Sequence, residues 1–196
     1  MTPRRTKTLT LLAGILASAL TLLAWTQEWF HLGVTGTDTA VTALSVPGST
    51  AAPDLSALSL AGFALVAALA ISGPALRVAF GVIQVALGAG VIASSVIAIQ
   101  GPVSSSAAAV TKATGVSGPD SIAALVSSVD TSAWPVVAVI LGVITAVIGI
   151  VTVFTVRRWP GPTRRYDAVG TGRGKESGGS VSDWDELSGG SDPTAR

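Results

Sequence analysis

Four long apolar stretches alternate with polar segments along the chain. They cover residues 8–27, 55–76, 78–100 and 133–156, and none of them contains Asp, Glu, Lys or Arg. About 20 apolar residues in a helix cross the roughly 30 Å hydrocarbon layer of a membrane. A helix also satisfies its own backbone hydrogen bonds in lipid, which a lone strand does not. The pattern therefore predicts an all-α membrane protein in which four transmembrane helices form a bundle.

The first stretch also has features of a secretory signal peptide. A basic segment precedes it, and the small residues Ala17-Ser18-Ala19 fit a cleavage site. The apolar run nevertheless continues past Ala19 and ends near Trp25, which favours a helix that stays in the protein. The signal peptide is the alternative interpretation.

The basic residues are unevenly distributed between the polar segments. Eleven of the 12 Lys and Arg precede the first stretch, follow the fourth, or stand at Arg77 in the tight turn between the second and third. Basic residues are concentrated on the cytoplasmic side of membrane proteins. Both ends of the chain, residues 1–7 and 157–196, are therefore expected in the cytoplasm, and the membrane is expected to be a bacterial plasma membrane.

The two remaining segments, residues 28–54 and 101–132, are expected to be extracytoplasmic loops. The first is rich in Thr, Gly, Ala and Ser and shows only weak strand-like alternation. The second predicts a short amphipathic helix from Pro119, because proline and an acidic residue suit a first helical turn. We expect this helix to lie on the membrane surface or to cap the bundle. Its apolar stripe at helical spacing consists of Ile122, Leu125, Val126 and Val129.

Tryptophan residues lie close to the predicted helix ends. Their amphipathic rings prefer the boundary between membrane and water. The predicted interfacial anchors are Trp25, Trp29, Trp134 and Trp159.

The composition of the chain argues against most kinds of catalytic and metal-binding site. Only 12% of residues are charged, the net charge is +1, mean hydropathy is +0.64, and there is no Cys. The single His31, near Glu28, cannot form a metal site without further ligands. We therefore expect no catalytic residue, no metal, no cofactor and no nucleic-acid binding, and we interpret the chain as not being an enzyme.

Gln84 is the most polar residue well inside an apolar stretch, on one predicted face with Gly81 and Gly88. An amide in lipid is expected to turn inward and hydrogen-bond a neighbouring helix. A structural contact is favoured, and a substrate contact is the alternative. Small residues four positions apart, such as Gly14 and Ser18, let helices approach closely. They predict a compact bundle or a homo-oligomer, without separating the two.

Residues 157–196 are rich in Gly, Ser and charge, which predicts a disordered cytoplasmic tail. Within it, an isolated aromatic residue and a leucine are flanked by acids, a pattern that suits binding to a folded cytoplasmic protein. In the alternative, Trp184 only dips to the membrane surface. The basic residues after the fourth stretch are interpreted as a topology signal, and attraction to anionic lipid is the alternative for them. The candidate partner-binding residues are Trp184, Leu187, Asp192 and Pro193.

Several short motifs stand out in the last third of the chain. They are Trp134-Pro135, Arg158-Trp159-Pro160, Arg165-Tyr166-Asp167, Asp183-Trp184-Asp185-Glu186-Leu187-Ser188 and Asp192-Pro193-Thr194. With them, the sequence resembles the actinobacterial tryptophan-associated transmembrane protein family, four-span proteins named for their gene neighbourhood. The resemblance implies an association with tryptophan biosynthesis, and no catalytic residue or cofactor. The chain departs from the family at Gly189-Gly190-Ser191, where a charged stretch is expected.

The favoured interpretation is thus an integral membrane protein that acts through protein contacts. Its expected partners are membrane lipid, a cytoplasmic protein bound by the tail, and a second copy of the chain. The alternative is a small transporter or exporter component for tryptophan or a related aromatic metabolite. A membrane enzyme is the least supported reading, because the acids, bases and metal ligands are so few.

Overall fold

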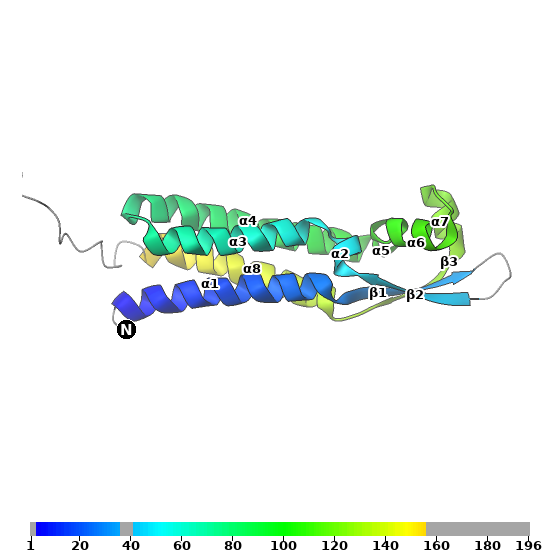
Figure 1. The fold of residues 1–196 in the computed structure, drawn as a ribbon, viewed down its shortest axis with the longest axis horizontal. Helices are drawn as coiled ribbons and strands as arrows, with labels where there is room; N and C mark the ends of the chain where they lie inside the picture. The colour runs from blue at the N-terminus through cyan, green and yellow to red at the C-terminus, as the bar shows by residue number, and fades with distance from the viewer. Residues whose placement is uncertain (1–2, 36–40, 156–196) are drawn as a thin grey trace, which may run out of the picture. The chain divides into compact units, whose positions relative to one another are not determined.

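The computed structural model describes residues 3–35 and 41–155. Within these ranges, four long helices lie side by side (Figure 1). Each is long and apolar enough to cross a membrane, so the predicted four-helix membrane fold is confirmed. The four helices are α1 (Pro3–Thr26), α3 (Asp54–Ile71), α4 (Pro74–Gln100) and α8 (Trp134–Thr155).

The turn between α3 and α4 lies earlier in the chain than the sequence predicted. Helix α3 ends at Ile71 and α4 begins at Pro74, because proline suits a first helical position. Arg77, expected in the turn, therefore lies inside the first turns of α4 and is only 3% exposed. Lys7 of α1 donates a hydrogen bond of 3.0 Å from Nζ to the carbonyl oxygen of Ala70 in α3. This contact satisfies a carbonyl at the end of α3, where a cation is favourable.

Helices α4 and α8 pack backbone against backbone. A Cβ added at Gly88 would lie 2.5 Å from the amide nitrogen of Ala146, and one at Gly149 would lie 2.7 Å from the carbonyl oxygen of Gly81. No side chain larger than hydrogen fits at these positions without a shift of the helices. Small residues on both helices thus bring the backbones of α4 and α8 into close contact.

The segments between the long helices form a sheet, which an all-α interpretation did not include. Its three antiparallel strands follow the order β2-β1-β3. We call residues 28–35, 41–53 and 101–133 the sheet region. Its strands are β1 (Glu28–Thr35), β2 (Val41–Pro47) and β3 (Val126–Thr131), and its short helices are α2 (Gly48–Ala51), α5 (Pro102–Ser105), α6 (Ala107–Thr114) and α7 (Pro119–Leu125).

Alternation along β1 explains why this segment forms a strand. Phe30, Leu32 and Val34 are buried, whereas His31 between them is exposed. Apolar residues two positions apart face the same side of a sheet. A register irregularity between Glu28 and Phe30 lets the adjacent Trp29 be buried as well.

The apolar stripe predicted on one short helix is divided between two elements. Helix α7 ends at Leu125, and Val126 and Val129 belong to β3. A second register irregularity, between Gly33 and Val34 of the partner strand, disturbs the alternation along this pair. The predicted helical face was therefore wrong beyond Leu125, although all four stripe residues pack in or against the same apolar core.

The largest apolar core lies where the sheet region meets the four helices. Trp29, Phe30, Leu32, Val46 and Leu55 are each no more than 1% exposed within it. Ala24, Ala98 and Ala138 bring the ends of three long helices into the same cluster. The sheet region and the bundle thus share one core at this junction.

Candidate functional site

The junction between bundle and sheet region centres on Trp29. Its ring is fully buried, and its Nε1 donates a 2.8 Å hydrogen bond to the carbonyl oxygen of Ala24 at the end of α1. A Cβ at Gly48 would lie 2.6 Å from that same Nε1, so only glycine fits there. Trp29 was predicted to be an interfacial anchor. A fully buried ring contacts no lipid headgroup, so its role is to join two regions of the protein.

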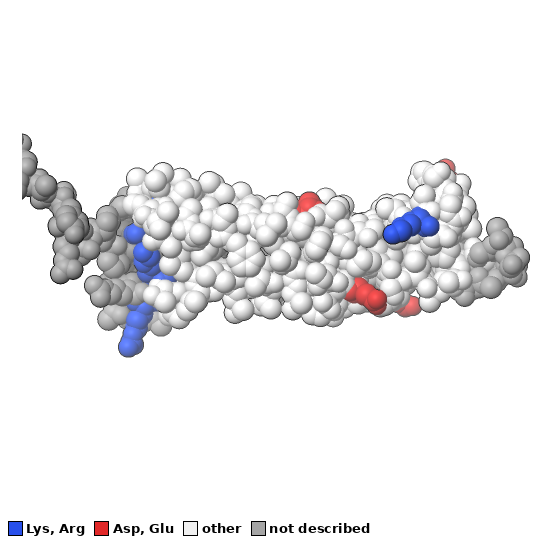
Figure 2. All heavy atoms as spheres, viewed as in Figure 1, with Lys and Arg blue, Asp and Glu red and all other residues white. Residues whose placement is uncertain are grey.

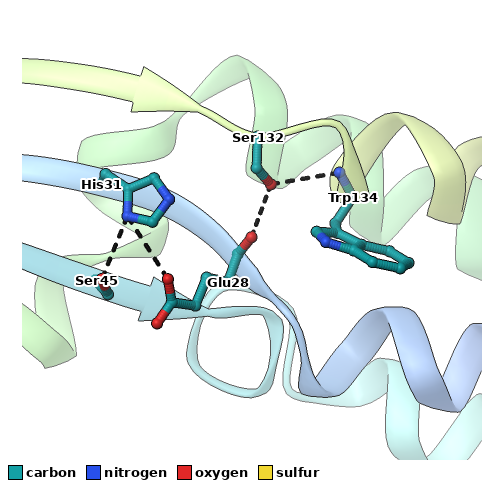
Figure 3. A network of polar contacts seen from close by, with 5 residues as sticks. All are labelled: Glu28, His31, Ser45, Ser132 and Trp134. Atoms are coloured by element: carbon teal, nitrogen blue, oxygen red, sulfur yellow. Dashed lines mark hydrogen bonds and ion pairs between the residues drawn. The ribbon is translucent and has the colours of Figure 1, made fainter.

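On the other side of this junction, Ser132 connects the start of β1 with the start of α8 by hydrogen bonds (Figure 3). Its backbone N–H donates to the carbonyl oxygen of Trp29 at 2.9 Å, and its hydroxyl donates to that of Glu28 at 2.7 Å. The same hydroxyl accepts a hydrogen bond of 3.3 Å from the backbone N–H of Trp134. The last residues before α8 are therefore tied to the first residues after α1, which holds the sheet region in a fixed place on the bundle.

A polar row crosses the uncovered face of the sheet next to this junction. His31 Nδ1 lies 3.2 Å from Ser45 Oγ on β2 and 3.8 Å from Glu28 Oε2 on its own strand (Figure 3). On the other side, His31 is opposite Asp130 of β3. In the part of the chain that the structure describes, no group of three or more His, Cys, Asp or Glu side chains is placed to hold a metal ion. The row is a solvent-facing polar surface that can make hydrogen bonds and charge pairs with a partner.

An open hollow of about 750 Å³ lies behind the sheet, between the end of α4 and helices α5, α6 and α7. Its wall is mainly apolar and built from small residues such as Gly101, Pro102 and Ala107. Asp120 is the one charged side chain in this wall. Smaller hollows flank β2, one of them beside Lys112. The sheet region therefore offers concave apolar surface that the protein itself does not fill.

Gln84 lies inside the bundle and is 2% exposed. Its side chain reaches α1, where Nε2 would be 3.5 Å from a Cβ at Gly14. The amide thus turns inward, but within residues 3–35 and 41–155 its Oε1 accepts no hydrogen bond. The neighbouring Gly81 and Gly88 pack on α8, whereas Gln84 faces α1, so the three residues do not share one partner helix. The expected interhelical hydrogen bond through Oε1 is therefore not made by the described residues.

Gln84 belongs to a buried row on α4 with a spacing of seven residues. The other members are Arg77, Val91 and Ala98, each at most 4% exposed. Polarity falls along this row from the α3–α4 turn toward the sheet region. We call these four residues the α4 seam.

The other predicted site residues are distributed as follows. Trp25 and Trp134 are half-buried at the ends of α1 and α8, next to the shared core. Trp159 and the candidate partner-binding residues Trp184, Leu187, Asp192 and Pro193 lie outside the described residues.

The family model of the tryptophan-associated transmembrane proteins matches residues 11–194 of the chain. The chain belongs to the tryptophan-associated transmembrane protein family. The family resemblance and the membrane character predicted from the sequence are thereby confirmed. No curated protein and no solved structure matches the chain.

In this family member, sequence reasoning missed the contribution of Trp29 and of the sheet. The signal was present in the alternation of Phe30, Leu32 and Val34 with His31 and Gly33. It was obscured because Trp29 follows directly after an apolar stretch, where an aromatic residue suits a membrane boundary equally well. Ser132 carried no signal, since a serine before a helix is common and its role depends on a strand one hundred residues earlier.

Proposed function

We propose that this tryptophan-associated transmembrane protein is not an enzyme and acts by binding other proteins, in connection with tryptophan biosynthesis. The sheet region is the binding part of the described chain, and the four-helix bundle is its support. The hollow behind the sheet and the polar row on its front supply the surfaces that a partner would contact.

The observation that carries this proposal is the junction between the two regions. The Trp29 side chain is hydrogen-bonded to the end of α1, and the Ser132 side chain is hydrogen-bonded both to the start of β1 and to the start of α8. These bonds fix the sheet region to the bundle. The contact between α4 and α8 leaves no space for a methyl group at Gly88. Transporters move one helical unit against another to expose a site alternately. A fixed junction and closely packed helices suit a rigid support better than such a motion.

We further propose a plasma-membrane location with both termini in the cytoplasm. Most of the described Lys and Arg side chains gather at the end of the helices where the α3–α4 turn lies, Lys112 in the sheet region being the exception, and the acidic ones lie toward the sheet region (Figure 2). The described basic residues at that end include Arg5, Lys7 and Arg77. This distribution supports a cytoplasmic α3–α4 turn and an extracytoplasmic sheet region.

The tail is proposed as a second, cytoplasmic contact. Trp184 and Leu187 among acidic residues motivate this part of the proposal. Truncation after Tyr166 is expected to leave membrane insertion and thermal stability unchanged and to remove a cytoplasmic protein from affinity purifications. If the truncated chain recovers the same cytoplasmic proteins as the full chain, the tail is not the contact.

A second candidate function, transport of tryptophan or a related aromatic metabolite, is favoured by Gln84. A buried amide oxygen without a partner among the described residues can accept a hydrogen bond from a passing ligand. Flux of labelled tryptophan into vesicles that contain only the purified full chain distinguishes the two functions. We expect flux equal to that of protein-free vesicles. Flux that the protein produces and Gln84→Leu abolishes would overturn the binding proposal in favour of transport.

A further inference from the structure

Strand β3 is an edge of the sheet, and its hydrogen-bonding pattern can be assigned. The bond from the backbone N–H of Ser132 to Trp29 identifies these two residues as a directly bonded pair. In an antiparallel ladder such pairs alternate, so Asp130 and Ser128 also direct their backbone groups toward β1. The backbone groups of Val129 and Thr131 therefore point away from the sheet.

This outward edge is open. Ser127, Ser128, Asp130 and Thr131 are exposed, and Val129 is half-buried. Over the described ranges, no backbone hydrogen bond reaches the outward groups of Val129 or Thr131. An edge of this kind accepts an additional strand, because main-chain hydrogen bonds supply the binding and alternate side chains supply the specificity.

The other edge, β2, is less suited to accept a strand. Helix α6 contacts it, and the two smaller hollows lie beside it. Its last residue, Pro47, has no N–H to donate. Helices α5 and α7 contact β3 as well, but β3 contains no proline, so each of its outward N–H groups can donate a hydrogen bond.

A symmetric pair of β3 strands from two copies does not fit a single membrane. The strands run in nearly the same direction as the long helices (Figure 1). Antiparallel strands in one sheet are related by a two-fold axis perpendicular to the sheet. In this protein that axis would be perpendicular to the long helices. That axis would invert one copy relative to the membrane. The occupant that fits is an extended segment of a different protein.

The charge of the sheet region indicates which side chains the bound segment carries. The described acidic residues Glu28, Asp54, Asp120 and Asp130 all lie in or next to the sheet region, where Lys112 is the single described basic residue. Asp130 belongs to β3 itself, and Glu28 lies on the neighbouring strand close to His31. We infer that the free edge of β3 binds an extended, basic polypeptide segment as a fourth strand. This inference rests on the proposed function, since it names the partner class of the sheet region.

The test uses the full chain in a neutral detergent and a fluorescent nonapeptide of alternating Val and Lys, with a Val and Glu peptide of the same length as its counterpart. Anisotropy is expected to show binding of the Lys peptide alone. Val129→Pro removes the outward N–H, a change that an edge strand tolerates. It is expected to weaken binding about tenfold, whereas Val129→Thr, which keeps the N–H, is expected to bind like the wild type.

Amide hydrogen exchange gives a readout that does not depend on the variants. In the wild-type protein the Lys peptide is expected to slow exchange at Val129 and Thr131 and to leave β2 unchanged. Equal binding of the Lys peptide by Val129→Pro, equal binding of the Glu peptide, or no binding at all would overturn the inference. So would light scattering that shows Val129→Pro dissociating an oligomer, because the occupant would then be a second copy. An absence of peptide binding together with an absence of tryptophan flux contradicts the edge site alone and leaves the proposed function standing.

Discussion

The core at the sheet region and the interior of the bundle beyond it are built from different residues. Around Trp29, Phe30 and Leu55 the core is apolar and contains two aromatic rings in an edge-to-face contact, with centroids 6.4 Å apart. Toward the α3–α4 turn, the buried residues include hydroxyls, the Gln84 amide and the Arg77 guanidinium. Several hydroxyls there, such as that of Thr152, donate to the carbonyl oxygen four residues earlier.

The difference follows from the solvent that each region meets. A region that faces water gains free energy by removing large apolar side chains from it. Lipid tails are as apolar as leucine, so helices in a membrane gain nothing comparable and associate through close packing and polar contacts instead. Accordingly, large side chains hold the sheet region, and glycines hold α4 against α8.

The largest effect is expected from Trp29→Ala. Loss of a fully buried indole and of its bond to Ala24 should lower the free energy of unfolding by about 3–5 kcal/mol, measured by thermal unfolding of the purified protein in mild detergent. Trp134→Ala is the matched control, because that ring is only half-buried. Equal losses in the two variants would contradict the central role of Trp29.

Gly88→Val should have the next largest effect, since the new side chain would meet the backbone of α8. We expect a loss of about 1–3 kcal/mol in helix packing, seen as a lower unfolding temperature with the sheet region still folded. Gly73→Ala is the control, because a Cβ there has nothing within 4 Å. A neutral Gly88→Val would show that α4 and α8 separate easily.

Gln84→Leu sharpens the comparison within the bundle. Loss of an interhelical hydrogen bond, such as the sequence predicted for Gln84, would cost about 0.6–2 kcal/mol. Among the described residues Oε1 has no hydrogen-bond partner, which reverses that expectation, because removal of a buried unsatisfied acceptor relieves its desolvation penalty. We now expect unchanged or slightly higher thermal stability, by up to about 1 kcal/mol. A clear loss would mean that the amide has a partner after all.

The smallest structural effect is expected from single cysteines introduced for labelling. They test which region of the protein lies outside the cell. The chain has no native cysteine to react in the background. In intact cells, Ala43→Cys on the exposed face of β2 should react with an impermeant reagent, and Ser177→Cys should not. Labelling of Ser177→Cys in intact cells would reverse the proposed orientation.

The four helices could be predicted because each contains a long apolar stretch without charge, and a single segment satisfies its own backbone in lipid only as a helix. The sheet could not, because its strands are short and their periodicity is disturbed. Val126 and Val129 stand three apart, which is typical of a helix, and the register irregularity opposite them is visible only once β1 and β3 pair. Trp29 illustrates the same limit, since its sequence neighbours fit a membrane boundary and its burial depends on Gly48.

The order of the strands along the chain has a consequence for biosynthesis. The middle strand, β1, precedes α3 and α4, and its second neighbour, β3, is made only just before α8. At about 5–20 residues per second, the ribosome needs on the order of 4–16 s to make the 78 residues between β2 and β3. During that interval the β1–β2 hairpin carries an open edge and an uncovered apolar face. In the proposed orientation, the second polar segment must then cross the membrane before the sheet can close, so we expect the delivery of β3 to set when the nascent protein becomes resistant to proteolysis.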